Sequence, residues 1–244
     1  MKSISLLQWN IWYKEPIDFV ISEIQRWNPD IVCIQECITR PGYHSARLLA
    51  KALDYSLIYV PAQHWSNNPL KQEQGNEILS RFPIHSSRSV FLQTERQTPK
   101  DGSDEGRVYI EVEIQIGATL LTVGTTHLSY SPKFAYTPKR ADEAKKLIEL
   151  IAQKQKKYIF AGDLNSPLDS PIITNLEKYL VNSGPTYDQP TWTTKPFDYH
   201  GWQEDQLRWR IDYVFATPDI KVESAKILKT TVSDHLPILV TIEL

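Results

Sequence analysis

The sequence predicts an α/β fold in which two mixed β-sheets pack face to face and helices cover the outside. Two observations support this fold class. Strand and helix patterns alternate along the chain, and hairpin signals occur among them, so the pattern is not that of an all-parallel sheet. The 244 residues contain no repeat and no interdomain linker, and 41% of them are hydrophobic, which is ample for a core. We therefore expect a single domain over residues 1–244.

The first half of the chain begins with strand and helix patterns in turn. Ile17, Val20 and Ile24 form an apolar stripe with helical spacing, and Pro16 opens this helix. A second helix is predicted over residues 44–53. Short apolar runs predict strands at residues 4–9, 31–35 and 56–60.

The second half contains the clearest strand pattern. Residues 108–116 alternate between apolar and polar side chains, and a Gly-Ala turn leads into a partner strand over residues 119–126. Pro138 opens a helix that we expect to end near residue 153. Its basic residues are expected to lie mostly on a solvated outer face: Lys139, Arg140, Lys145 and Lys146. Later strands are predicted at residues 158–161, 211–216, 222–228 and 236–242.

Three long segments are predicted to be loops, at residues 61–74, 93–106 and 183–209. Long loops in a compact domain are usually functional or disordered. The third segment carries many aromatic side chains, which argues against disorder. It is either a loop that packs down on its own aromatic residues or a wall that faces the substrate.

Polar side chains that suit a metal or a phosphate stand just after several short apolar runs. Asn10, Glu36 and Asp163 are placed in this way, and His235 lies near the last predicted strand. Loops at strand ends commonly carry chemistry, so we expect one converging site. Carboxylates and amides suit a hard cation such as Mg²⁺, and histidines suit phosphate oxygens.

Each of these residues also has a plain structural interpretation. Glu36 can be a salt-bridged acid at a strand end, and Asn10 a turn residue. Asp163 and Asn165 are two apart on a segment expected to be extended, so both side chains should face the same side. One carboxylate could then take a proton from water while the amide holds the water or a phosphate oxygen. The same pair can also be a turn or a helix cap.

Six motifs stand in a fixed order along the chain: Asn10, Gln35-Glu36, Thr126-His127-Leu128, Gly162-Asp163-Leu164-Asn165, Arg210-Ile211-Asp212-Tyr213 and Ser233-Asp234-His235. Together they resemble the endonuclease/exonuclease/phosphatase (DNase I-like) superfamily. Residues 75–83 resemble its middle signature, and the similarity extends from residue 4 to about residue 243. The resemblance implies a four-layer α/β sandwich and phosphoester hydrolysis that depends on Mg²⁺, for which Mn²⁺ can substitute.

The resemblance also implies catalytic roles. Asp163 would activate the water and Asn165 would position it. Asp212 would pair with His235, which contacts phosphate. His127 stands where the sphingomyelinase, deadenylase and tyrosyl-DNA phosphodiesterase branches carry a phosphate-contacting histidine. AP endonucleases usually carry asparagine there, so His127 disfavours that branch.

Metal binding and substrate binding are assigned from the same resemblance and from the loops. Glu36 is the expected metal ligand, Asp234 would lie near the metal, and Asn10 would support both metal water and phosphate. Asn76 belongs to the middle signature and could equally serve strand pairing. The candidate substrate-binding residues are Asn76, Trp12, Tyr13, Trp65, Trp192 and Trp202.

We therefore expect a metal-dependent phosphoesterase that hydrolyses a phosphodiester by in-line attack of an activated water. The expected substrates are nucleic-acid ends, including single-stranded ends, or a DNA–protein adduct. One alternative is a phosphodiesterase or phosphatase that acts on a small molecule or a lipid head group, like sphingomyelinases or inositol phosphatases. A second alternative is a non-catalytic binding module with the same fold, although a pure scaffold has no need for a buried polar cluster.

Composition adds expectations about partners and location. The net charge of −2 does not suggest a strongly basic grip on nucleic acid. No apolar run reaches the ~18 residues that a membrane span needs, and the N-terminal residues lack the features of a signal peptide. Cys33 and Cys37 are expected to be reduced thiols. We expect a cytoplasmic monomer.

Overall fold

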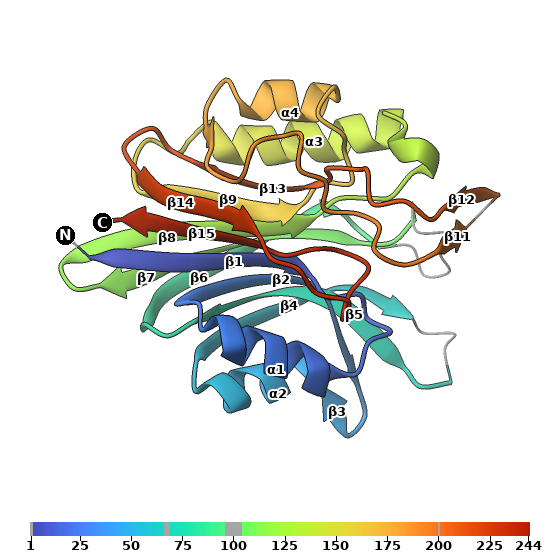
Figure 1. Ribbon diagram of the computed structural model, residues 1–244, viewed down its shortest axis with the longest axis horizontal. Helices are drawn as coiled ribbons and strands as arrows, with labels where there is room; N and C mark the ends of the chain where they lie inside the picture. The colour runs from blue at the N-terminus through green and yellow to red at the C-terminus, as the bar shows by residue number, and fades with distance from the viewer. Residues whose placement is uncertain (1, 66–68, 96–103, 200) are drawn as a thin grey trace.

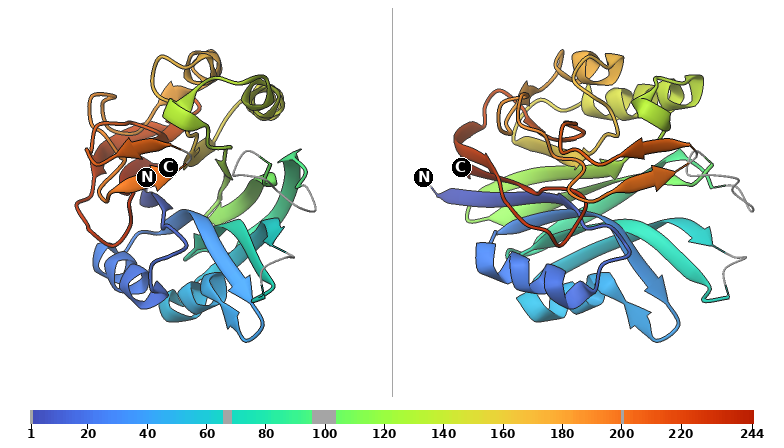
Figure 2. Two further views of the ribbon diagram at one scale, coloured as in Figure 1. Left: turned by 90° about the vertical axis from the view of Figure 1, so that its right-hand side faces the viewer. Right: turned by 45° about the vertical axis from the view of Figure 1, so that its right-hand side comes forward.

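The computed structural model describes residues 2–65, 69–95, 104–199 and 201–244, and Figure 1 shows their arrangement. Two mixed β-sheets pack face to face, with one pair of helices outside each sheet. This confirms the predicted fold class. The end-on view in Figure 2 shows the two sheets facing one another. Within the described residues, no helix combines the length and apolarity that crossing a membrane requires.

The first sheet contains both ends of the described chain. Its strand order is β14-β15-β1-β2-β5-β4, and β3 pairs with β2. β1 runs parallel to β2 and antiparallel to β15, so the first and last strands lie side by side. Its members are β1 (Ser3–Asn10), β2 (Ile31–Arg40), β3 (Tyr43–His44), β4 (Ser56–Trp65), β5 (Gln72–Ser80), β14 (Lys221–Ile227) and β15 (Ile238–Glu243).

The second sheet has the order β10-β13-β9-β8-β7-β6. β8 and β9 are parallel, and β13 runs antiparallel to β9 with Asp212 opposite Asp163. Its members are β6 (Ile84–Gln93), β7 (Arg107–Ile116), β8 (Thr119–His127), β9 (Tyr158–Asp163), β10 (Val181–Asn182) and β13 (Asp212–Ala216). A separate hairpin joins β11 (Phe197–Tyr199) to β12 (Trp202–Glu204).

The helices cover the outer faces of the sheets. α1 (Ile17–Trp27) and α2 (Ser45–Leu53) lie against the first sheet, and α3 (Pro138–Ile151) and α4 (Pro171–Leu176) lie against the second (Figure 1). A short 3₁₀ turn, η1 (Pro132–Phe134), precedes α3. Apolar side chains fill three layers, one between the sheets and one beneath each helix pair. These layers bury both faces of the central strands, which explains their continuous apolar runs.

The side chains between the sheets change from apolar to polar at one end of the molecule. On β1, Ile4 and Leu6 lie in the inter-sheet core, and the next positions on that face are Gln8 and Asn10. Successive side chains of a strand alternate between its two faces, so these four belong to one row. β9 has the same switch, from core residues to the buried Asp163. Neighbouring strands make the change at the same end, which concentrates polar groups there.

One prediction about an irregular segment was wrong, and one strand was not predicted. Residues 61–65 and 72–74 of the predicted loop are strand, because β4 continues to Trp65 and β5 begins at Gln72. This part of the hairpin is rich in polar side chains and has a bulge between Pro61 and Gln63, so it lacks the apolar alternation of a core strand. β6 was also missed, since it is an edge strand with mostly exposed side chains. The prediction for residues 93–106 falls largely on 96–103, which lie outside the described residues.

The prediction for α3 was right about the helix and wrong about one side chain. The helix ends at Ile151, close to the expected end. Arg140, which was expected on the solvated face, is 1% exposed.

A buried carboxyl group lies on the opposite, helix-facing side of the first sheet from the polar end, level with Ile34 and Trp9. Glu77 on β5 is 0% exposed; its carboxyl group faces the Cys37 thiol and has no other hydrogen-bond partner within the described part of the chain. Burial raises the pKa of Glu77 to about 8. The folded protein therefore keeps this proton at pH values where the unfolded chain releases it.

We expect this carboxyl group to make the free energy of unfolding fall as pH rises from about 4.5 to about 8. The effect is about 1.4 kcal/mol for each unit of pKa difference. Glu77→Gln removes the titration, so its unfolding free energy should vary less over that range, and its advantage over wild type should grow toward pH 8. Urea unfolding at a series of pH values measures this. Glu113→Gln on β7 is the control, and identical pH profiles for wild type and Glu77→Gln would contradict the prediction.

Candidate active site

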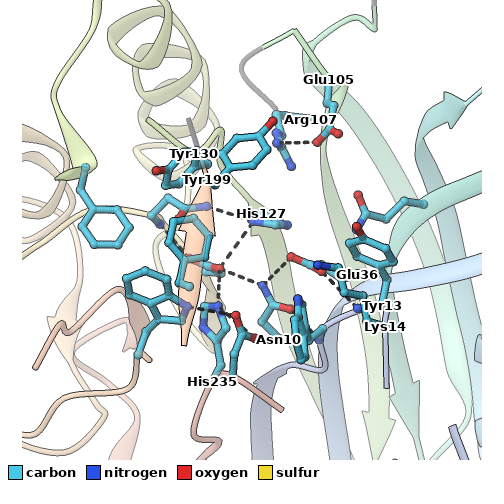
Figure 3. Close-up of a pocket in the computed structure, with 18 of the residues that line it drawn as sticks. Asn10, Tyr13, Lys14, Glu36, Glu105, Arg107, His127, Tyr130, Tyr199 and His235 are labelled. Atoms are coloured by element: carbon cyan, nitrogen blue, oxygen red, sulfur yellow. Dashed lines mark hydrogen bonds and ion pairs between the residues drawn. The ribbon is translucent and has the colours of Figure 1, made fainter. Parts of the chain in front are cut away.

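At the end of the molecule where the side chains between the sheets become polar, they line a cavity of about 210 Å³ (Figure 3). The ends of β1, β2, β8 and β9 and the segment before β15 all contribute to its walls. The predicted site residues that line it are Asn10, Glu36, His127, Asp163, Asn165, Asp234 and His235. Asp212 lies behind them, bonded to His235. The structure thus brings together side chains that are as much as 225 positions apart in sequence.

Asp163 is at the centre of this group. Its carboxylate is 1% exposed and accepts a 3.0 Å hydrogen bond from Asn10 Nδ2. His127 Nε2 and His235 Nε2 lie 3.5 and 3.7 Å from the same oxygen. Burial, followed by the negative charge of Asp212, raises the pKa of Asp163 to about 7. A carboxylate tuned in this way can both take and release a proton near neutral pH.

The turn after β9 differs from the extended geometry that was predicted. Asn165 has a φ of 46°, in the left-handed region, and its backbone N–H donates a 2.8 Å hydrogen bond to Asp163 Oδ1. An asparagine tolerates this conformation better than most residues. Both side chains still face the cavity, because the turn, and not the alternation of a strand, aims Asn165.

His127 is held as a hydrogen-bond acceptor. The Asn165 Nδ2 group lies 3.0 Å from His127 Nε2 and donates a 2.9 Å hydrogen bond to the carbonyl of Leu128. Since that amide nitrogen is a donor, the ring nitrogen facing it must accept. Burial, and then the positive charge of Arg107, lower the pKa of His127 well below its ordinary value. His127 is therefore a neutral imidazole in this arrangement.

His235, unlike His127, carries a positive charge. Its Nδ1 lies 2.9 Å from Asp212 Oδ2, and its Nε2 lies 3.9 Å from Asp234 Oδ1. Burial lowers the pKa of His235, but the charges of Asp212, Asp234 and Asp163 outweigh it and raise the pKa to about 10. His235 is thus an imidazolium whose orientation is fixed by Asp212.

The Asn10 amide joins the two sheets at this end. Its Nδ2 donates to Asp163 Oδ2 and, at 3.1 Å, to Glu36 Oε1, while its Oδ1 accepts from the N–H of Trp12. Glu36 reaches the cavity because β2 has a bulge there and Glu36 adopts a φ of 66°. Without the bulge, alternation would point its side chain toward the helices, as it does for Ile34.

Two groups of side chains could hold a divalent cation. One is Asp163, Asp212 and His235, whose ligand atoms lie within 4.8 Å of one another. In this group His235 Nδ1 lies 2.9 Å from Asp212 Oδ2, so these side chains already pair with each other, and Asp212 lies behind the cavity and not on its wall. This group suits proton transfer better than metal binding.

The second group is Glu36 with Asp234, which face the same cavity. The Glu36 carboxylate accepts from Asn10 and from the N–H of Tyr13, and no ion pair to a lysine or arginine is found for it among the described residues. Burial, followed by the charge of Asp234, raises the pKa of Glu36. Two acids that repel each other beside a cavity fit a hard cation, which would offset both charges. Glu36, Asp234 and the remaining lone pair of Asn10 Oδ1 are the oxygen atoms available to it.

The candidate substrate-binding residues divide into two sets. Trp12, Tyr13 and Trp65 line the cavity, and Tyr13 and Trp65 form an edge-to-face pair with ring centroids 5.5 Å apart. Trp192 also lines it, but it is 3% exposed and its indole N–H donates to Asp234 Oδ2 at 3.1 Å. Trp192 therefore positions a carboxylate as well as forming a wall.

Asn76 and Trp202 lie outside the main cavity. Asn76 donates a hydrogen bond to the carbonyl of Val108 and lines a small inner pocket beside Glu36, so it links the two sheets. Trp202 is 7% exposed and packs in an aromatic cluster with Phe134, Trp192 and Ile211. The segment 183–209 thus both packs on its own aromatic residues and supplies cavity walls through Phe197 and Tyr199.

Sequence reasoning missed several cavity residues, namely Lys14, Gln74, Glu105, Arg107, Tyr130 and Phe134. Arg107 is the most telling omission. It is 5% exposed, pairs with Glu105 at 3.1 Å and donates to Ser129 Oγ. Its place directly before an alternating strand, next to the strand that ends in His127, was the available signal.

A family model described as "Endonuclease/Exonuclease/phosphatase family" matches residues 7–235. The chain belongs to the endonuclease/exonuclease/phosphatase family, as its motifs predicted. No curated protein sequence matches it.

Solved structures with the same fold superpose on the whole chain. The endonuclease/exonuclease/phosphatase from Beutenbergia cavernae has a TM-score of 0.79 and 21% identity, and the match covers 100% of this chain and 72% of that one. D. rerio TDP2 complexed with a single-strand DNA product has a TM-score of 0.72 and 18% identity over 100% of both chains. The mannosyl-6-phosphatase from Bacteroides thetaiotaomicron has a TM-score of 0.71 and 18% identity over 99% and 100%. At these identities the likeness establishes the fold alone.

The assignment of Glu36 to a cation site leads to a test in the absence of substrate. We expect Mg²⁺ to raise the melting temperature of the wild type, since a ligand at 100 times its Kd stabilises the folded state by about 2.7 kcal/mol. Glu36→Gln should melt higher than wild type without Mg²⁺, because one of two repelling acids is gone, and should lose most of the Mg²⁺ response. Differential scanning calorimetry with and without chelator measures both. Glu105→Gln, on the same cavity, is the control. A full Mg²⁺ response in Glu36→Gln would show that the cation binds elsewhere.

Proposed function

We propose that this protein is a metal-dependent phosphoesterase that hydrolyses a phosphodiester, with Asp163 as the group that takes the proton of the attacking water. The observation that carries the proposal is the Asp163 carboxylate, which is buried at the cavity, lies 3.5 Å from His127 and has a pKa of about 7. Membership of the endonuclease/exonuclease/phosphatase family supports phosphoester hydrolysis as the reaction class.

In the proposed reaction each side chain has a separate task. Asp163 accepts the proton as the water oxygen bonds to phosphorus and the bond to the leaving oxygen breaks. The His235 imidazolium, fixed by Asp212, places positive charge against a phosphate oxygen. Asn165 Oδ1, the acceptor left on that amide, holds the attacking water in line, and His127 fixes the amide through Nε2. A divalent cation bound by Glu36 would add positive charge for the phosphate oxygens and the leaving oxygen.

The cavity walls support an unpaired base or an aryl group as the neighbour of the scissile phosphate. Tyr13, beside Glu36, and Tyr130, beside Tyr199, stand on different sides of the cavity in Figure 3. The Tyr130 and Tyr199 rings are 5.6 Å apart, and Tyr13 packs against Trp65. Aromatic side chains stack on unpaired bases with about 1–3 kcal/mol each. TDP2, which shares the fold, has been solved with a single-strand DNA product.

The role of Asp163 is tested by a nearly isosteric substitution. Asp163→Asn should lower kcat by ~10²–10⁴-fold, the contribution typical of a general base. Its melting temperature should stay level or rise, since repulsion from Asp212 is removed. Steady-state kinetics and calorimetry on the same preparation measure the two effects. Asp212→Asn should reduce kcat more mildly, by releasing His235. Asp219→Asn, exposed near the start of β9, is the control. Near-normal kcat in Asp163→Asn would reduce Asp163 to a turn-capping residue.

The substrate class is tested by salt dependence. We expect higher kcat/KM on single-stranded ends or aryl adducts than on intact duplex, with a shallow dependence on salt, because the chain has a net charge of −2. The affinity of an enzyme for duplex DNA falls as the salt concentration rises. The slope of log affinity against log salt concentration is about −0.9 for each phosphate contact. Measurements of kcat/KM across a salt series on both substrates, with and without chelator, decide the question. Efficient internal cutting of plain duplex, with a salt slope that corresponds to several phosphate contacts, would contradict the proposal. Hydrolysis of sugar or lipid phosphoesters alone would replace it with the small-molecule alternative.

A further inference from the structure

Arg140 is a buried cation beneath the site. It lies in the first turn of α3, and its guanidinium contacts two loops at once. One is the turn after β9, where it donates to the carbonyls of Leu164 and Asn165. The other is the segment around η1, where it donates to the carbonyls of Phe134 and Ala135 at 3.0 and 3.1 Å. Both loops line the cavity, through Asn165 and Phe134 respectively.

Glu143 stands next to Arg140 on the same face of α3 and is also 1% exposed. It does not pair with Arg140 by a hydrogen bond or short ion pair among the described contacts. Its carboxylate instead accepts from the backbone N–H of Ser129 at 3.0 Å and from the Ser129 hydroxyl at 2.6 Å. Ser129 follows His127 by two residues, and its hydroxyl in turn accepts from Arg107 Nε. Glu143 thus fixes the loop that follows β8.

Two buried charges in one helical turn are expensive unless their hydrogen bonds are satisfied. The rest of that α3 face is apolar, with Ala144, Leu147 and Ile151 in the core beneath the second sheet. An apolar pair at these positions could fill the volume, but it could not hold backbone groups in two loops. The two charged side chains are therefore needed to hold the backbone of the two loops in place.

We propose that Arg140 and Glu143, which we call the α3 clamp, are positioning residues that hold Asn165 and His127 in register with Asp163. The inference rests on the proposed function, because it assigns Asn165 and His127 a task in hydrolysis. Asn165 Nδ2 spans from His127 to the Leu128 carbonyl, so it depends on both loops at once. A shift of either loop would move the Asn165 amide away from the attacking water, while the ends of β1 and β2 on the other side of the cavity stay in place.

The test uses mild substitutions in the full-length chain. Arg140→Lys keeps the charge but loses the forked hydrogen bonds, and Glu143→Gln keeps the shape but loses the charge. Each should lower kcat about 10- to 100-fold, the cost of a displacement near 1 Å, with KM within about twofold of wild type. Amide hydrogen exchange should accelerate in residues 128–135 and 164–166 and stay unchanged elsewhere. In an Asn165→Ala background, Arg140→Lys should cost little more.

Leu147→Ala, on the same buried face of α3, is the matched control for lost stability. It should lower the melting temperature with kcat per folded molecule unchanged. The proposal is overturned if the clamp variants keep kcat, if they lose no more than Leu147→Ala does, or if exchange in the two loops does not change. Absence of any phosphoesterase activity in the wild type would refute the proposed function, and the exchange measurement would still decide whether the clamp orders the two loops.

Discussion

The hydrogen bonds from the Asn10 amide to Asp163 and Glu36 are the interaction on which the site depends. They cross the gap between the two sheets at the end where inward-facing side chains become polar. The apolar layer between the sheets sets that gap, and close packing keeps it rigid. The Asn10 amide donates to two carboxylates, which would otherwise lie together in a poorly solvated space without this donor. In the proposed reaction it also separates them into two environments, a cation side at Glu36 and a proton-transfer side at Asp163.

The location of the site could be predicted from sequence, because Asn10, Asp163 and His127 each end a run of core residues. Period-two alternation places such residues on the same face as the core, so their convergence follows from the fold class. The details that break alternation could not be predicted. Glu36 enters through a bulge, and Asn165 through a left-handed turn. Both features depend on pairing with other strands and loops, which one segment of sequence does not reveal.

The solvent exposure of individual side chains was the other property that could not be predicted from the sequence. The basic residues of α3 look alike in sequence, yet Arg140 is buried because two loops present carbonyls to it. β6 was missed for the opposite reason, since an edge strand with exposed polar side chains resembles a loop. Trp192 shows a related ambiguity. Its aromatic face suited a substrate wall, and its indole N–H holds Asp234. A side chain with an apolar ring and a polar N–H can pack in the core and also bond to a residue of the site.

The central claim is the division of labour between the cation side and the proton-transfer side. Anomalous diffraction from crystals soaked in Mn²⁺ tests it most directly, because it locates the ion without reference to activity. We expect a peak beside Glu36 and Asp234, with His235 still bonded to Asp212. A peak between Asp163, Asp212 and His235, the other group able to hold an ion, would contradict the account. Asp163 would then be a ligand, and the water would need another base.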